Sequence, residues 1–305
     1  MYDVIIIGGG PAGLTAAIYL ARKKINTVIL TQTIGGQIMD GPLIENYPGF
    51  EQITGPDWVE KVKSQVEKLK VEVKSGSVEK IIKENGVFSV EGSGYEKLQA
   101  KAILICSGKS PRKLNIPGED KFQGKGISSC VTCDGPLFQE KIVAVIGGGN
   151  SAISAALELS KYAQKVYILN LGSELIGEQV RIDELKKNPK VEIIGQAKTM
   201  EIKGTNLVES LKYKDLKSQE EKEIACEGIF SEIGWEPSTG YLQNFVTLTS
   251  KKEIKIDENN ATDIEGVFAA GDATEIVKKQ LVIAAGEGAK AALNVWDYLT
   301  LKAKQ

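Results

Sequence analysis

The feature that most restricts the fold of this 305-residue chain is a glycine-rich turn between a buried strand and a helix. Residues 3–7 read Asp-Val-Ile-Ile-Ile, a run typical of a strand buried on both faces of a parallel sheet. Gly8-Gly9-Gly10-Pro11-Ala12-Gly13 follows at once, a helix is expected from about Ala12 to Lys23, and the next strand from Thr27 to Leu30. In this context the pattern predicts a βαβ unit that binds a dinucleotide, because the glycines let the backbone approach a pyrophosphate that the helix N-terminus faces.

The same unit occurs a second time. Lys141 to Ile146 is expected as a strand, Gly147-Gly148-Gly149-Asn150-Ser151-Ala152 as the turn, Ile153 to Tyr162 as the helix and Val166 to Leu169 as the next strand. Two such units indicate two bound dinucleotides, and an enzyme with two usually passes electrons between a nicotinamide and a flavin. The alternative is that the second unit is vestigial.

The remaining segments complete an α/β pattern on a chain long enough for two hydrophobic cores. Apart from the two units, the pattern predicts amphipathic or small-residue helices and further strands, some joined by the hairpin turn Glu84-Asn85-Gly86. The expected helices are Pro56 to Leu69 and Val282 to Leu299, and the expected strands lie within Val71 to Val90, Ala102 to Cys106, Val191 to Glu201, Leu207 to Tyr213, Lys222 to Ile233 and Glu265 to Ala270.

Cys130-Val131-Thr132-Cys133-Asp134 is interpreted as a redox dithiol with an adjacent proton carrier. The Cys-x-x-Cys spacing closes a small disulfide and favours thiolate near neutral pH. A zinc site would need two more ligands, yet the chain has no histidine, and Cys106 and Cys226 stand alone in sequence. An inert bridge would close a very small loop and stabilise the fold little.

Composition excludes several other function classes. Without histidine, Ser-His-Asp and Cys-His mechanisms are impossible and the commonest metal ligand is missing. A formal charge of -2 and a pI near 5.6 favour neither nucleic acid nor an anionic membrane as a partner. No apolar run is long enough to span a bilayer, and residues 1–7 leave no room for a leader, so a cytoplasmic location is expected.

Taken together, the motifs identify a family resemblance from end to end. The chain resembles the low-molecular-weight thioredoxin reductases, most closely the C-terminal flavoprotein module of the alkyl hydroperoxide reductase flavoprotein subunit. Besides the two glycine turns and the dithiol, which continues as Gly135-Pro136-Leu137-Phe138, the matching stretches are Gly35-Gly36-Gln37, Glu45-Asn46-Tyr47-Pro48-Gly49, Gly271-Asp272, Lys279-Gln280 and Ala285-Gly286-Glu287-Gly288-Ala289-Lys290.

The resemblance implies an α/β fold with two Rossmann-like domains, the second inserted into the first. The FAD domain would comprise residues 1–113 and 245–305, and the NAD(P) domain, which carries the dithiol, residues 114–244. The implied FAD contacts are Gly8, Gly10, Pro11, Ala12, Gly13, Gly36, Gln37, Asn46, Gly271, Asp272, Lys279 and Gln280. The implied NAD(P) contacts are Gly147, Gly149, Asn150, Ser151 and Asn170.

The resemblance also implies the electron path, from NAD(P)H to FAD, to the Cys130–Cys133 disulfide and on to a partner disulfide. In that path Cys133 meets the flavin, Cys130 attacks the partner and Asp134 handles the proton. Because the chain begins at the FAD strand, the acceptor is expected to be a separate thioredoxin or glutaredoxin-like protein, feeding a peroxiredoxin. Relatives of this type are usually homodimers.

One departure from the family bears on the electron donor. The NADPH-dependent thioredoxin reductases carry a basic cluster after the second unit's second strand, whereas this chain has Asn170-Leu171-Gly172-Ser173-Glu174-Leu175-Ile176. A 2'-phosphate would find no cation in that stretch, so NADH is predicted over NADPH, with Asn170 bonding a ribose hydroxyl. Two alternatives stay open: a ferredoxin-dependent reductase with a vestigial nicotinamide site, and a flavin redox sensor without turnover.

Overall fold

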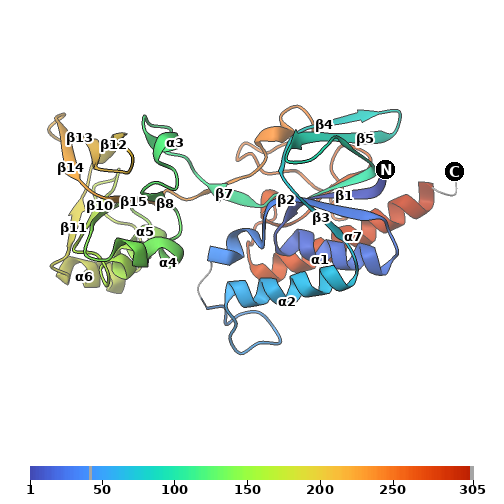
Figure 1. Cartoon of the computed structure of the whole chain (residues 1–305), viewed down its shortest axis with the longest axis horizontal. Coiled ribbons are helices and arrows are strands. Elements are labelled where there is room, and N and C mark those ends of the chain that lie inside the picture. Colours follow the sequence, from blue (N-terminus) through green and yellow to red (C-terminus); the bar gives the residue numbers. More distant parts are fainter. Residues whose placement is uncertain (41–42, 303–305) are drawn as a thin grey trace. The chain divides into compact units, whose positions relative to one another are not determined.

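The computed structural model describes residues 1–40 and 43–302, with the backbone alone for Asp40, Thr132, Cys133 and Lys302. The chain divides into two units: Met1–Ser110 with Glu236–Gln305 form unit 1, and Pro111–Trp235 form unit 2 (Figure 1). The second is therefore inserted into the first, and both are α/β, as the fold-class prediction stated. The boundaries lie before residues 111 and 236, against the expected 114 and 245. The second lies earlier because Leu242 already packs in the core of unit 1.

Unit 1 is built on a seven-stranded sheet in the order β3-β2-β1-β6-β5-β4, with β17 paired to β6. The strands β1 (Tyr2–Gly9), β2 (Thr27–Ile34), β3 (Glu72–Ser75), β6 (Leu98–Ile105) and β17 (Val267–Ala269) run parallel. The antiparallel hairpin β4 (Ser77–Glu84) and β5 (Val87–Ser93) turns at Asn85 and Gly86, as predicted. The carboxyl ends of the parallel strands thus gather at one edge of the sheet.

Helices cover one face of this sheet. Val4 and Ile6 of β1 belong to the core formed with α1 (Pro11–Arg22), α2 (Gly55–Lys68) and α7 (Leu281–Lys302), whereas Ile5 and Ile7 face the opposite core, which includes β4 and β5. This alternation explains why β1 reads as an uninterrupted apolar run. A Cβ atom on Gly288 would lie 2.1 Å from the carbonyl oxygen of Ala12, so the small residues of α7 serve close packing against α1 (Figure 1).

Unit 2 repeats this plan on a five-stranded parallel sheet in the order β11-β10-β9-β15-β8. Its strands are β8 (Ile127–Ser128), β9 (Ile142–Ile146), β10 (Lys165–Leu169), β11 (Val191–Ile194) and β15 (Gly228–Ser231). The core on one face includes α4 (Val131–Asp134), α5 (Asn150–Leu159) and α6 (Gln179–Lys187). The other face is covered by an antiparallel sheet of β12 (Ala197–Lys203), β13 (Ser210–Asp215) and β14 (Glu221–Ala225).

Two expected strands each prove to be two strands in different sheets. The run from Val191 to Glu201 divides into β11 and β12 because Gln196 adopts a left-handed conformation (φ 53°). The run from Lys222 to Ile233 divides into β14 and β15. Helix α6 was not predicted at all.

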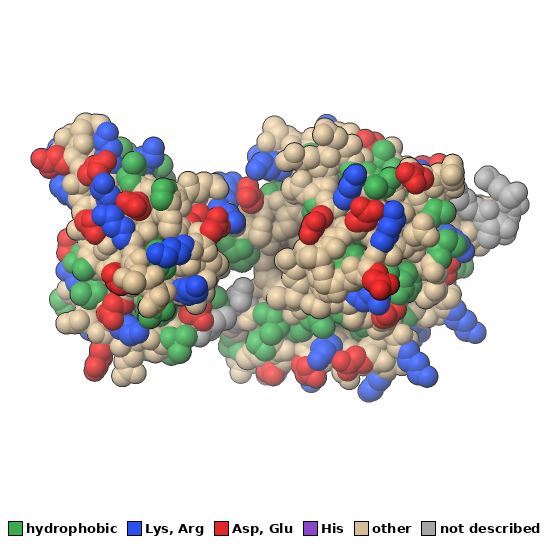
Figure 2. All heavy atoms as spheres, turned by 45° about the horizontal axis from the view of Figure 1, so that its top comes forward, with side chains coloured by type: hydrophobic (Ala, Val, Ile, Leu, Met, Phe, Trp, Pro, Cys, Tyr) green, Lys and Arg blue, Asp and Glu red, His purple; other side chains and the backbone are tan. Residues whose placement is uncertain are grey.

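Short elements complete the two units. They are β7 (Lys109–Pro111) paired with β16 (Trp235–Pro237), α3 (Glu119–Phe122), and the 3-10 helices η1 (Gly36–Asp40), η2 (Gly135–Phe138), η3 (Gly240–Leu242) and η4 (Gly271–Ala273). Acidic and basic side chains are interspersed on the face shown in Figure 2, so that face carries no extended patch of one sign. In the part of the chain that the structure describes, no helix is long and apolar enough to cross a membrane.

Candidate functional site

The first glycine turn leads from β1 into the N-terminus of α1. A Cβ on Gly13 would lie 1.9 Å from the carbonyl oxygen of Gly8, so glycine is required there for strand and helix to pack. Pro11 occupies the first helical turn, the N-cap residue Gly10 offers no side-chain cap, and no acidic residue lies in that turn. The free N–H groups and the helix dipole therefore favour a phosphate.

The second glycine turn has the same character at α5. Its N-cap residue, Gly149, also lacks a side-chain cap, and the first turn again contains no acid. A Cβ on Gly149 would meet no atom within 4 Å, so the backbone is open to a ligand. Ser151 is exposed in the first turn of α5. Both turns thus fit a dinucleotide pyrophosphate.

Among the other residues predicted to hold FAD, Gly36 and Gly271 lie beside the first turn. A Cβ on Gly36 would lie 3.5 Å from the Cα of Gly10, and one on Gly271 would lie 3.0 Å from the Cβ of Ala12. The side-chain amide of Asn46 donates to Gln280 Oε1 at 3.2 Å. The amide of Gln37 donates to the carbonyl oxygen of Lys109 at 3.2 Å. All twelve predicted FAD residues therefore belong to unit 1.

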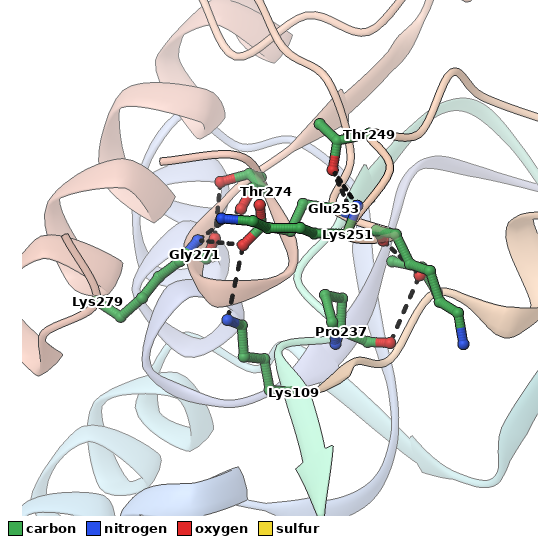
Figure 3. A network of polar contacts seen from close by, with 10 residues as sticks. Lys109, Pro237, Thr249, Lys251, Glu253, Gly271, Thr274 and Lys279 are labelled. Atoms are coloured by element: carbon green, nitrogen blue, oxygen red, sulfur yellow. Dashed lines mark hydrogen bonds and ion pairs between the residues drawn. The ribbon is translucent and has the colours of Figure 1, made fainter. Parts of the chain in front are cut away.

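Two charged residues of this site, Lys109 and Glu253, were missed by the sequence analysis. Lys109 Nζ and Lys279 Nζ each lie 3.7 Å from the same oxygen, Oε1 of Glu253 (Figure 3). Lys279 Nζ also donates to the carbonyl oxygen of Thr274 at 2.5 Å. A lysine directly after Ser107-Gly108 was a weak signal for Lys109, but nothing in the sequence marked Glu253.

Burial shifts the protonation of the neighbouring groups. It raises the pKa of Asp272 above its ordinary value, and the positive charges of Lys279 and Lys109 offset part of that rise. Burial lowers the pKa of Lys279, although the carboxylate of Glu253 opposes the change. The site therefore holds a partly desolvated set of interacting charges.

The dithiol lies in unit 2, at the start of α4. Cys130 N donates to Ser128 Oγ at 3.0 Å, Asp134 N donates to the carbonyl oxygen of Cys130 at 3.1 Å, and Val131 anchors the helix in the core. Cys130 is disulfide-bonded. The side chain of Cys133, which was predicted to meet the flavin, lies outside the described residues.

The other two cysteines are buried free thiols, Cys106 in unit 1 and Cys226 in unit 2. Burial raises the pKa of both, to about 12 at Cys226, so neither is a nucleophile near neutral pH.

The loop after β10 is folded back onto the second glycine turn. Asn150 Oδ1 accepts from Glu178 N at 3.0 Å, and Ile176 N donates to the carbonyl oxygen of Gly148 at 2.7 Å. Asn170, predicted to bond a ribose hydroxyl, is buried and uses its amide inside this loop: Nδ2 donates to the carbonyl oxygen of Glu174 at 2.6 Å and Oδ1 accepts from Gly172 N at 3.2 Å. Its first role is therefore to shape the loop.

The structure also brings a cation to this region that the sequence analysis did not consider. Arg181 of α6 donates from Nη1 to Ser154 Oγ of α5 at 2.7 Å. A residue so far beyond the loop could be found only from the packing of α6 on α5. Among the residues whose positions are described, no cluster of three or more acidic or cysteine side chains could hold a metal ion.

Comparisons with known proteins agree with this arrangement. Residues 2–289 match the family model described as pyridine nucleotide-disulphide oxidoreductase. The F subunit of alkyl hydroperoxide reductase from Staphylococcus epidermidis is 41% identical over 299 residues, which cover 98% of this chain and 59% of that relative. The chain thus spans about three fifths of the length of the curated relatives that it matches.

Solved structures match over nearly the whole of both chains. Thioredoxin reductase from Lactococcus lactis has a TM-score of 0.83 at 35% identity, with 98% of this chain and 99% of that chain covered. Thioredoxin reductase from T. acidophilum has a TM-score of 0.80 at 35% identity with the same coverage. The fold is therefore shared with these proteins from end to end.

Proposed function

The chain belongs to the pyridine nucleotide-disulphide oxidoreductase family, and we propose on that basis that it is a flavoprotein disulfide reductase. Electrons would pass from a pyridine nucleotide through FAD to the disulfide of Cys130 and on to a disulfide of a separate protein. The observation that carries this proposal is the combination of two uncapped, acid-free helix N-termini after glycine turns with a disulfide at Cys130. A chain with one dinucleotide site, or with only buried thiols, would not support it.

FAD, when bound, supplies two-electron transfer between a nicotinamide and a disulfide. The N-terminus of α1 would bind its pyrophosphate, while Gln37, Asn46, Asp272 and Gln280 would fix the rest of the cofactor. The N-terminus of α5 would bind the pyrophosphate of the pyridine nucleotide. The open space beside the backbone of Gly149 supports that role, because a vestigial nucleotide site would not need to keep its backbone accessible to a ligand.

Reduction of the partner would follow thiol–disulfide exchange. After two electrons have opened the disulfide, the Cys130 thiolate attacks one partner sulfur, forming a mixed disulfide and releasing the other partner sulfur as a thiolate. Cys133 then attacks the Cys130 sulfur, which closes the disulfide and releases the second partner sulfur. The partner takes up two protons in all, and Asp134, next in sequence to Cys133, would carry one of them.

We propose a thioredoxin or glutaredoxin-like protein as the acceptor, working upstream of a peroxiredoxin. The likeness to two thioredoxin reductases over 99% of their length supports the first step, and the relatedness to the F subunit of alkyl hydroperoxide reductase supports the second. We expect a homodimer, as is usual in the family, acting in the cytoplasm, where a dithiol of this spacing is catalytic rather than structural.

NADH is the proposed donor. The loop from 170 to 178 contributes Glu174 and Glu178 and no lysine or arginine, and a 2'-phosphate would be repelled by these carboxylates. Arg181 is the cation that opposes this preference, because its bond from Nη1 to Ser154 Oγ leaves its charge intact.

Steady-state reduction of a thioredoxin-fold substrate with NADH and NADPH in parallel tests the donor. We expect kcat/KM for NADH to exceed that for NADPH by about tenfold or more, since a single uncompensated charge costs about 1.4 kcal/mol or more at a partly desolvated site. Arg181→Met should widen the ratio if any NADPH activity depends on that cation. Equal efficiency with the two nucleotides would contradict the preference.

A further inference from the structure

The cluster formed by Lys109, Glu253 and Lys279 places two ammonium groups on one carboxylate oxygen. Both Nζ–Oε1 distances are 3.7 Å. The three side chains are only 20%, 16% and 21% exposed, in the order Lys109, Glu253, Lys279. Figure 3 shows the two lysines reaching the carboxylate from different segments, Lys109 from the start of β7 and Lys279 from the loop before α7.

This arrangement has more positive than negative charge. Two like charges held near each other and largely out of water repel, and one carboxylate compensates only one of them. The additional bond from Lys279 Nζ to the carbonyl oxygen of Thr274 supplies a dipole but no full charge. The three residues alone therefore leave an excess of one positive charge, which the carboxylate of Asp272 opposes from a longer distance.

The cluster adjoins Gln37, Asp272 and Gln280, which we take to hold the flavin half of FAD. The backbone carbonyl of Lys109 is the acceptor for Gln37. Asp272 interacts electrostatically with both lysines, and Gln280 follows Lys279 directly in sequence. A ring bound among Gln37, Asp272 and Gln280 would thus lie in the field of both ammonium groups.

The positive field of the lysines would matter because the charge of the flavin ring changes on reduction. A hydride brings two electrons and one proton to the neutral oxidised ring, so the reduced ring carries one negative charge until a second proton arrives. Positive charge nearby stabilises the reduced form over the oxidised form, and charge near the ring is one of the ways in which a protein tunes a flavin. We propose that Lys109 and Lys279, held together by Glu253, raise the midpoint potential of the flavin.

This inference rests on the proposed function, because it requires FAD in unit 1. The competing interpretation is that the ion pairs of the cluster have only a structural role, in which they stabilise the packing of the start of β7 against the loop before α7. The two interpretations differ in sign. If the cluster acts by charge, removing a lysine must lower the potential and removing the carboxylate must raise it. If its role is only structural, both changes break the same ion pairs and do not shift the midpoint potential in opposite directions.

The experiment is an anaerobic redox equilibration of FAD-loaded protein against a reference dye, with slow reduction followed at the flavin and dye absorbance bands. Lys109→Met should shift the flavin–dye equilibrium toward oxidised flavin by about tenfold, which corresponds to about 30 mV for a two-electron couple. Glu253→Gln should shift it in the opposite direction. Lys109→Arg should behave as the unmodified protein, because it keeps the charge.

Lys251→Met is the matched control, since it removes a lysine at an exposed position in the loop that contains Glu253 and should leave the equilibrium unchanged. If Lys109→Met fails to bind FAD, the shift measured for Glu253→Gln alone tests the inference, with a shift toward reduced flavin expected. Shifts of the same sign in the two variants, or no shift in either, would overturn the inference. The assay uses neither a pyridine nucleotide nor a protein disulfide, so those parts of the proposed function can fail independently, whereas a protein that binds no FAD would refute the proposed function itself.

Discussion

At the scale of single residues, Glu232 has a carboxyl group that is partly shielded from water. Glu232 directly follows β15, and its N–H donates to the carbonyl oxygen of Ile146 at 2.8 Å. A Cβ atom on Gly147 would lie 2.4 Å from the backbone carbonyl oxygen of Glu232. Glu232 therefore adjoins the second glycine turn. Burial raises the pKa of its carboxyl group to about 7.

This shift predicts how the free energy of unfolding depends on pH. Below about pH 4.5 Glu232 is protonated in both the folded and the unfolded chain, so it contributes no difference. Between about 4.5 and about 7 the unfolded chain binds fewer protons than the folded one, so stability falls as pH rises. Glu232→Gln should remove this decline. The free energy of unfolding of the variant, minus that of the unmodified protein, should therefore be larger at pH 8 than at pH 4.

Urea unfolding at several pH values measures this effect, with Glu220→Gln, an exposed carboxylate of the same unit, as the control. An identical pH dependence in Glu232→Gln and the unmodified protein would show that Glu232 titrates normally.

At the scale of elements, the loop from 170 to 178 determines how the second glycine turn is presented. Asn170 and Asn150 fix it through their side-chain amides. Asn170→Ala removes both bonds made by one of these amides while leaving unit 1 unchanged. The loop would then lose its fixed conformation beside the proposed nucleotide site.

We therefore expect Asn170→Ala to raise KM for NADH by about three- to tenfold, because two hydrogen bonds of about 0.5 kcal/mol each no longer order the loop. The FAD content should be unchanged. Asn206→Ala, which alters an exposed asparagine in the same unit, is the control. An unchanged KM in Asn170→Ala would mean that the loop does not contribute to nucleotide binding.

The elements differ in how well the sequence predicts them. The continuous β-branched run of β1 and its repeat in β9 identify buried parallel strands, and the glycines that follow identify the turns. The division of 191–201 into β11 and β12 could not be predicted, because alternation along a strand does not reveal which sheet it joins. Helix α6 also escaped prediction, since its nine residues bury only Ile182 and Leu185 and give a weak periodic pattern.

At the scale of the whole molecule, the repeated glycine turn predicts two dinucleotide-binding units, and the family resemblance predicts that one is inserted into the other. The polar contacts between distant segments could not be predicted in this way. Lys109 meets Glu253 only because the fold of unit 1 brings β7 beside the loop at 249–253. Arg181 meets Ser154 only because α6 packs on α5.

The electron path as a whole is tested by an anaerobic titration of the FAD-loaded protein with NADH, followed at the flavin absorbance band. If electrons pass through FAD to the disulfide of Cys130, the protein should consume about two NADH per FAD, one for each two-electron acceptor. Cys130→Ser should consume about one and still show a bleached flavin. Consumption of about one NADH per FAD by the unmodified protein would contradict this path, because the disulfide would then lie outside it.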